Sequence, residues 1–334
     1  MECATLFFIS IDSYIIAVKL IDMDKFAIFH IDGGCGKNIV ATSVVKSIKA
    51  AYPEHKIIVV TAWPEVFIHN PHIHRVYKFG NIPYFYDDYI NGKESKIFRM
   101  EPYHSEALLY RKKSLSGIWC DVFGIPCVDD KPNIFLTERE LLFAQHQMQK
   151  DGPVLLVQSS GGAEQQGHPY SWSRDLPPVF AQEVVDAVRG SFSKVLHVRR
   201  DNQPEITNTV KVTDGFRNLF CYVALSDKFL CIDSFAQHAA AAFNRPAVVG
   251  WISNSPTVFG HDIHTNIVAT GHESFRHRID SYLESDDWTG GRFHECPYDN
   301  INKMFDKDQF VEAILGSKSG ELLFDMPPLA TTIV

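Results

Sequence analysis

The stretch of sequence that decides the fold is 25–53, KFAIFHIDGGCGKNIVATSVVKSIKAAYP. Its apolar run Phe26–Ile31 predicts a buried strand, and the glycine-rich segment Asp32–Lys37 predicts a turn. The apolar spacing from Asn38 to Ala51 predicts a helix, and Lys56–Thr61 (KIIVVT) predicts the next strand. A strand, a glycine-rich turn, a helix and a second strand in this order indicate a parallel sheet with a right-handed crossover.

The remainder of the first half is less regular. Val66–Phe79 predicts a short helix, a break and a third strand. We expect residues 80–130 to be irregular and aromatic, with a helix-like stretch around Ser105–Phe123, as is typical of substrate loops. Thr137–Lys150 predicts a helix that begins with a capping box.

A second series of strands, loops and helices begins after Asp151–Pro153. Strands are predicted at 154–158, 195–198, 229–232 and 247–251, and helices at 177–189, 216–225 and 235–243. Two such series predict an α/β chain in which two Rossmann-like domains face each other. We expect the domains at 23–150 and 151–320, with an extension at 1–22 and a tail at 321–334.

Composition narrows the classes of function. The chain has 334 residues, is 45% hydrophobic and 22% charged, and carries a formal net charge of −8, which fits a globular protein of about two domains. The acidic balance disfavours a general binder of nucleic acid or of anionic membranes. Seven cysteines without a C-x-x-C pair argue against a disulfide framework or a zinc site and favour the reducing cytoplasm.

The N-terminal segment 4–20 is apolar but is interrupted by Asp12 and Lys19. We expect an additional strand or an appendage there. A signal peptide is the weaker alternative, and a membrane span is weaker still because the run is short and interrupted.

Three loops that follow predicted strands are candidates for ligand binding. In the first, Asp32–Lys37, backbone N–H groups near a helix start attract phosphate or a polar substrate. The loop matches neither the G-x-x-x-x-G-K-[ST] nor the G-x-G-x-x-G pattern. A tight turn without chemistry is therefore the alternative.

The second candidate is the strand end Asp233-Ser234, directly before the small-residue helix from Phe235. Ser234 or Asp233 can cap this helix, and its N–H groups can bind a diphosphate. His238 lies four residues after Ser234, so both can face the cleft. A capped, closely packed helix with a buried histidine is the alternative.

The third candidate joins Gln158–Gly162 with Tyr170–Asp175. Arg174 suits bidentate binding of phosphate. The alternative is an exposed loop in which Arg174 and Asp175 are solvated charges. Because open α/β sheets bind ligands beyond the carboxyl ends of their strands, the agreement of three such loops strengthens each one.

From about Lys25 to Leu315 the sequence resembles the glycosyltransferases of family 9, the bacterial lipopolysaccharide heptosyltransferase type with the GT-B fold. Gly33–Pro53, followed by KIIVVT and by Asn70–Val76, is similar to that family's G-D-x-x-x-T-x-x-h-x-x-h-x-x-x-x-P unit. Asp233-Ser234 with His238-Ala239-Ala240 resembles its D-[ST]-G-x-x-H-x-A motif. Pro246–Trp251 (PAVVGW) is similar to its K-P-x-h-x-h-F-G segment.

The resemblance implies transfer of a sugar from a nucleotide-diphosphate sugar to an acceptor hydroxyl, with inversion, without a metal and without a further cofactor. The donor is then bound mainly by the C-terminal domain, and a base deprotonates the acceptor. The triplets Asp22-Met23-Asp24 and Asp306-Lys307-Asp308 do not follow core strands, which disfavours a metal-diphosphate role. We expect a saccharide or glycoconjugate acceptor and no membrane span.

Two positions depart from the family pattern. Lys37 stands where the family has its catalytic aspartate, and a lysine is a base only if its pKa is greatly depressed. Asp32 is the substitute base that we expect, with His30, His238 and Glu101 as alternatives. Phe235 replaces the glycine after Asp-Ser, which reduces backbone freedom near the diphosphate.

The sequence therefore predicts three groups of site residues. Asp32 and Lys37 are the catalytic candidates. The candidates for donor binding are Ser159, Ser160, Gly161, Arg174, His197, Arg199, Asp233, Ser234, Phe235 and His238. The candidates for acceptor binding are Gly33, Gly34, Glu101, Tyr103, Arg111 and Lys112.

Three other functions stay open at this point. One is a GT-B nucleotide-sugar epimerase, which forms product without an acceptor. Another is a catalytically silent nucleotide- or sugar-binding protein, which Lys37 permits. The third is a DNA-modifying glycosyltransferase of the phage type, which the acidic charge disfavours and for which Arg111–Lys113 is the candidate phosphate contact.

Overall fold

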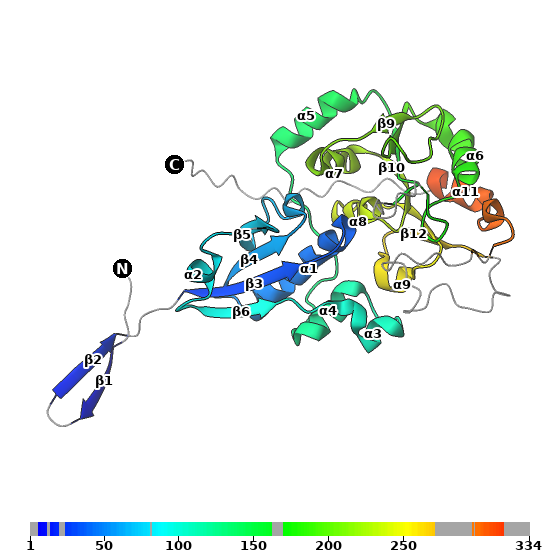
Figure 1. Ribbon diagram of the computed structural model, residues 1–334. Helices are drawn as coiled ribbons and strands as arrows, with labels where there is room; N and C mark the ends of the chain where they lie inside the picture. The colour runs from blue at the N-terminus through cyan, green and yellow to red at the C-terminus, as the bar shows by residue number, and fades with distance from the viewer. Residues whose placement is uncertain are drawn as a thin grey trace.

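The computed structural model describes residues 6–11, 14–19, 24–80, 82–161, 170–270, 296 and 298–316 (Figure 1). Its first large sheet is parallel, with the order β5-β4-β3-β6. The strands are β3 (Lys25–Ile31), β4 (Lys56–Thr61), β5 (Ile73–Lys78) and β6 (Glu94–Phe98). The β3–helix–β4 unit and the third strand predicted from the sequence are confirmed.

Helix α1 (Cys35–Ala51) connects β3 to β4 and begins three residues earlier than the sequence predicts. Gly36 and Lys37 therefore lie in its first turn and not in a loop. The Asn38 side chain explains this early start, because its amide donates to the Gly34 carbonyl at 2.9 Å. The hydroxyl of Thr61 at the end of β4 donates to the same side chain, which fixes α1 against the sheet.

Strand β6 corrects the prediction that residues 80–130 are irregular. Its sequence, ESKIF, has only two apolar residues, because it lies at the edge of the sheet beside β3 alone. The segment also contains α2 (Phe85–Tyr89), α3 (Glu106–Leu109) and α4 (Leu115–Phe123). The predicted helical stretch is thus two helices, separated by a turn in which Arg111 has φ of +50°.

The second large sheet is also parallel and has the order β12-β11-β10-β7-β8-β9. Its strands are β7 (Val154–Val157), β8 (Lys194–Val198), β9 (Val210–Val212), β10 (Lys228–Ile232), β11 (Val248–Trp251) and β12 (Thr265–Val268). Sequence reasoning missed β9 and β12, which have three and four residues and form the two edges. The strand at 248–251 is therefore not the last of the core.

Helices accompany this sheet at α6 (Pro178–Val188), α7 (Phe216–Leu225), α8 (Phe235–Ala242), α9 (Pro256–Phe259) and α11 (Lys307–Gly316). Single 3₁₀ turns occur at Pro64–Val66, Pro102–His104, Arg189–Ser191 and Ile301–Lys303. Helix α5 (Glu138–Met148) has the predicted capping box between Thr137 and Glu140. It precedes residue 151, yet it packs on α7 of the second half.

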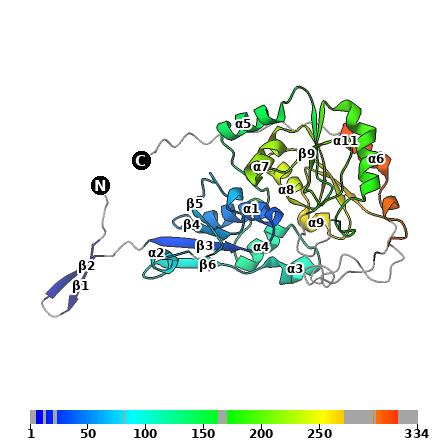
Figure 2. The same cartoon turned by 45° about the horizontal axis from the view of Figure 1, so that its top comes forward.

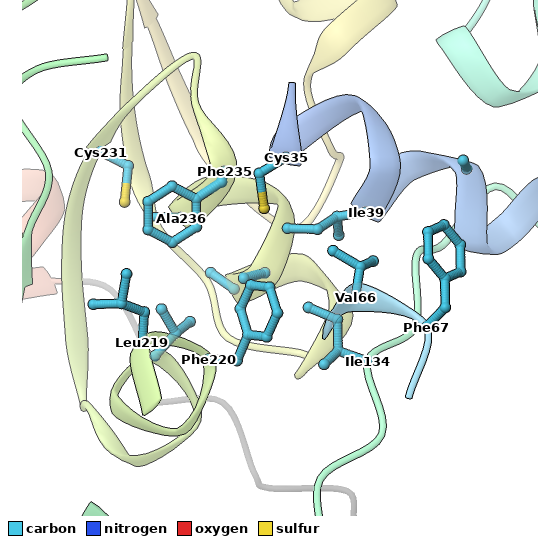
Figure 3. Packing of buried hydrophobic residues seen from close by; sticks show 14 of the residues in the cluster. Cys35, Ile39, Val66, Phe67, Ile134, Leu219, Phe220, Cys231, Phe235 and Ala236 are labelled. Carbon is cyan, nitrogen blue, oxygen red and sulfur yellow. The ribbon is translucent and has the colours of Figure 1, made fainter. Parts of the chain in front are cut away.

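A continuous apolar core joins the two halves, and Figure 2 shows α1 of the first half beside α8 of the second. Helix α1 packs on α8, and Figure 3 shows Cys35 and Ile39 of α1 near Phe235 and Ala236 of α8. Trp63 and Phe216 also meet edge to face at 4.8 Å between ring centroids. The inner ends of the two sheets are therefore held against each other by packed side chains.

The N-terminal segment forms a separate antiparallel hairpin of β1 (Leu6–Ile11) and β2 (Tyr14–Lys19), with Leu6 opposite Lys19. We expected an additional strand or an appendage, and the chain forms two strands there. No helix within the described part of the chain is long and apolar enough to cross a membrane.

Candidate active site

Each large sheet has one point where the strand order reverses, and the predicted site residues follow the strands at these two points. In the first sheet the reversal lies between β3 and β6, and in the second between β7 and β10. Residues after the carboxyl ends of such strands line the usual ligand position of open α/β sheets. The two reversal points meet, because a Cβ added to Gly36 would lie 2.9 Å from the His238 ring and 3.5 Å from the Phe235 nitrogen.

An ion pair between Lys37 and Glu101 occupies the reversal point of the first sheet. The Lys37 side chain is 9% exposed, and its ammonium lies 4.9 Å from the Tyr103 ring centroid and 5.3 Å from that of Trp119. Burial lowers the pKa of Lys37, and the hydrogen bond with Glu101 opposes this effect. The acceptor-side candidate Glu101 and the catalytic candidate Lys37 thus form one charged unit among aromatic rings.

The turn between β3 and α1 covers the stem of Lys37. Gly33 has φ of +92°, which favours glycine, and a Cβ there would lie 3.0 Å from the Lys37 chain. The Trp63 indole donates to the Gly33 carbonyl at 2.8 Å, and Asn38 donates to that of Gly34. Both carbonyl groups therefore accept hydrogen bonds from other side chains of the protein, although Gly33 and Gly34 are exposed.

Asp32, the predicted base, lies at the exposed side of this turn. Its side chain is 54% exposed, and its carboxylate lies 3.9 Å from Nδ1 of His30. The His30 ring stacks on Phe79. Burial lowers the pKa of His30, against the effect of Asp32. Asp32 and Glu101 thus stand in contrasting surroundings, one open to water and one enclosed.

Tyr103 connects this charged unit to the second domain. Burial raises the pKa of its hydroxyl, and the carboxylates of Glu101 and Asp233 raise it further while Arg174 opposes them. Glu101 belongs to the first domain, whereas Asp233 and Arg174 belong to the second. The structure therefore brings together four predicted residues from the two reversal points: Glu101, Tyr103, Arg174 and Asp233.

On the second domain, Asp233 follows β10 and accepts a hydrogen bond from the Asn254 amide. Its carboxylate lies 3.9 Å from the guanidinium of Arg174. Gly161 leaves room for Arg174, because a Cβ there would lie 2.7 Å from its side chain. Asp175 is buried, contrary to the alternative of an exposed loop, and accepts from the Gly161 and Ser171 amides at 2.7 and 3.0 Å.

Gln158 caps helix α8, a role that we predicted for Ser234 or Asp233. The Ser234 side chain makes no capping hydrogen bond. The side-chain oxygen of Gln158 accepts a hydrogen bond from the backbone amide of Ala236 at 3.1 Å, and the side-chain amide of Gln158 donates to the Ser234 hydroxyl at 3.0 Å. Sequence reasoning placed Gln158 in the third candidate loop but missed this capping role.

Two members of the predicted donor set lie in the joint between the domains. Phe235 packs edge to face on Phe216 and Phe220. His238 is 4% exposed, lies against Gly36, and its Nδ1 is 2.9 Å from Nε2 of His261. These positions correspond to the close-packing alternative that the sequence left open for this helix.

Three histidines beside this joint are buried in neutral surroundings. Burial lowers the pKa of His238, and it lowers the pKa of His261 to about 3 and that of His264 to about 4. His264 accepts from the Ala247 amide at Nδ1 and lies 2.8 Å from the Gln237 carbonyl at Nε2. Within the described ranges, no group of three or more His, Cys, Asp or Glu could hold a metal ion.

The other donor candidates follow β7 and β8. The Ser159 hydroxyl lies 3.0 Å from Nε2 of His197, and both residues are buried. Burial lowers the pKa of His197 to about 4. Ser160 is also buried, and Arg199 lies 3.3 Å from Glu205.

The two lysines of the basic segment Arg111–Lys113, on the acceptor side, form ion pairs with residues nearby in the chain. Lys112 pairs with Glu106 at 2.7 Å, and Lys113 pairs with Asp121 at 2.5 Å. Arg111 lies in the turn between α3 and α4. The two lysines therefore bind acidic side chains of their own segment, which weakens the case for this step as a contact to nucleic-acid phosphate.

Arg217 is a joining residue whose role the sequence did not reveal. Its guanidinium binds both carboxylate oxygens of Glu140 at 2.7 Å and donates to the carbonyls of Glu65 and Phe135. Burial acts to raise the pKa of Glu140, but Arg217 and Thr137 lower it to about 2. This contact links α7 to the first half of the chain.

No protein-family model and no curated protein sequence matches the chain. Solved structures do match it. A glycosyl transferase of family 9 from Veillonella parvula superposes with a TM-score of 0.62 over 89% of this chain and 99% of that chain, at 15% identity. The iron-containing dodecameric glycosyltransferase TibC of enterotoxigenic E. coli has a TM-score of 0.61 over 91% and 78%, at 12% identity.

The ADP-heptose heptosyltransferase II of E. coli superposes with a TM-score of 0.51 over 79% of this chain and 97% of that one, at 14% identity. These likenesses run through both domains. The prediction of two facing Rossmann-like domains is therefore confirmed, and this chain has the GT-B fold of these structures.

Proposed function

We propose that this protein is a glycosyltransferase of the family 9 type, which moves a sugar from a nucleotide-diphosphate sugar to an acceptor hydroxyl. One observation carries the proposal. Tyr103, whose ring lies 4.9 Å from the Lys37 ammonium of the first domain, also interacts with the charges of Asp233 and Arg174 of the second domain, at the joint between the two Rossmann-like domains. The likeness to solved glycosyltransferases over both domains supports it.

The second domain is the proposed donor side. Arg174 offers a planar cation that suits the oxygens of a diphosphate, and Asp233 offers an acceptor for sugar hydroxyls. Ser160 and Gly161 follow the neighbouring strand β7. His197 lies near the end of β8, and Arg199 directly follows that strand. Residues after β7 and β8 are suited to hold the nucleotide because they lie at the carboxyl edge of the sheet.

The reaction is a direct displacement at the anomeric carbon, with inversion and without a metal. The acceptor hydroxyl approaches from the first domain, where Glu101 and Tyr103 provide polar groups. Arg174 compensates the negative charge that develops on the departing diphosphate. The acceptor is a saccharide or glycoconjugate, which fits the acidic net charge of the chain better than DNA.

A panel of ADP-, UDP- and GDP-sugars tests this function, and ADP-heptose belongs in it because TibC has been crystallised with that donor. Release of the nucleotide diphosphate and the mass of the product are measured, with and without saccharide acceptors. We expect acceptor-dependent transfer, and Arg174→Ala to reduce it about 100-fold. Product without an acceptor would support an epimerase, and binding without turnover would support a silent binding protein.

A further inference from the structure

Glu101 carries a buried oxygen for which the described residues supply no hydrogen. Its Oε2 pairs with Lys37, whereas its Oε1 is enclosed and has no hydrogen-bond partner. A buried carboxylate oxygen without a hydrogen-bond donor is energetically costly. Such an oxygen in a binding region therefore indicates a position for a donor from a bound molecule.

We propose that Glu101 is the base of this enzyme and that its Oε1 takes the proton of the acceptor hydroxyl. The inference rests on the proposed glycosyl transfer and names the catalytic carboxylate of that site. It replaces Asp32, which the sequence favours for this role.

The surroundings of three carboxylates separate them. The Asp32 side chain is 54% exposed, while that of Glu101 is 26% exposed. Asp233 accepts from Asn254 and lies near Arg174, on the donor side. Glu101 is thus the less exposed carboxylate on the acceptor side, and its Oε1 is buried.

Lys37 is the positioning residue for this base. Its ammonium occupies Oε2 of Glu101, so that Oε1 is the oxygen left to act. The faces of Tyr103 and Trp119 hold the ammonium at 4.9 and 5.3 Å from their centroids, and the Gly33 turn covers its stem.

In the proposed step, the acceptor oxygen forms a bond to the anomeric carbon while the bond from that carbon to the diphosphate oxygen breaks. The acceptor proton moves to Oε1 of Glu101. The electron pair of the broken bond leaves with the nucleotide diphosphate. Glu101 later returns the proton to water, so that no other reactant is required.

Glu101→Gln tests the base directly, because it keeps the shape and removes the proton acceptor. The assay measures nucleotide release from the sugar nucleotide that the wild-type protein uses, with water or a saccharide as acceptor. We expect kcat to fall by about 10²–10⁴-fold, with the Kd of the nucleotide diphosphate changed less than threefold. Glu54→Gln, which alters an exposed Glu–Lys pair far from the site, should retain full activity.

Two further measurements separate chemistry from structure. Formate should restore part of the activity of Glu101→Ala, because a small carboxylate can occupy the vacated space. Lys37→Met should lower kcat while the Kd of the nucleotide diphosphate changes less than threefold, because the ammonium that holds Oε2 of Glu101 is gone.

The outcomes are distinguishable. If the wild-type protein transfers sugar and Glu101→Gln retains its rate, or if Asp32→Asn alone abolishes transfer, Glu101 is not the base although the proposed function stands. If the wild-type protein turns over no sugar nucleotide, the function and the inference fall together.

Discussion

In the first domain, the residues after the central strands bring two opposite charges, Lys37 and Glu101, into an aromatic enclosure. In the second domain, the charged side chains Asp233 and Arg174 lie 3.9 Å apart, and the neutral Gln158 satisfies the start of α8 from within the protein. Both sheets present a strand end followed directly by a helix. The comparison shows that a side chain at the end of a neighbouring strand can satisfy the N–H groups at such a helix start. Among the described residues, the ion pair instead leaves Oε1 of Glu101 without a hydrogen-bond donor.

The largest expected effect on stability tests the enclosed pair of the first domain. Lys37→Met should lower the free energy of unfolding by about 3 kcal/mol, because it leaves Glu101 without its counter-charge. Urea unfolding measures this loss. The double variant Lys37→Met/Glu101→Gln should recover part of it. Purely additive losses would show that the two charges do not depend on each other.

A smaller effect tests the joint where the two reversal points meet. Gly36→Ala should lower the free energy of unfolding by about 1–2 kcal/mol, because the new Cβ would lie 2.9 Å from the buried His238 ring. Gly34→Ala is the matched control, since a Cβ there meets nothing within 4 Å. Equal stability of the two variants in the same unfolding assay would mean that the domains are not in close contact there.

The capping of helix α8 by Gln158 in the second domain allows a comparable test. Gln158→Leu should cost about 1–2 kcal/mol, because it leaves the Ala236 amide and the Ser234 hydroxyl without their partner. Thermal and urea unfolding measure the loss. A Gln158 variant as stable as the wild type would contradict the capping role.

The smallest effect for a single group concerns the histidines of the second domain. His197, His261 and His264 have pKa values lowered to about 4, 3 and 4. The unfolded chain binds more protons than the folded protein below the ordinary histidine pKa, about 6.5. The contribution of each neutral histidine to the free energy of unfolding is therefore fully present above that pH. It falls as the pH is lowered, by about 1 kcal/mol per histidine between pH 7 and 5.5.

Urea unfolding at both pH values measures this dependence, and His197→Gln should reduce it by roughly one histidine's share. A slope that is unchanged in this variant would show that His197 does not contribute. The first domain provides the contrast, because His30 is only partly enclosed.

The sequence predicted the central strands of both sheets because they are buried and apolar. Phe26–Ile31, Val154–Val157 and Phe229–Ile232 all lie within such runs. It missed β6, β9 and β12 because strands at or near an edge are short or polar, so that their pairing depends on a neighbour and not on their own pattern. It also identified the strand ends that carry Asp233 and the Gly33 turn.

The sequence by itself determined the order of the buried central strands and of the helices between them, since burial imposes an apolar period that can be read locally. It could not determine which polar groups meet, because these contacts join residues far apart in the chain. Lys37 meets Glu101, and Gln158 caps a helix that begins at Phe235. Only the tertiary structure decided that Glu101 is enclosed and Asp32 exposed, because burial of a side chain depends on how both domains pack around it.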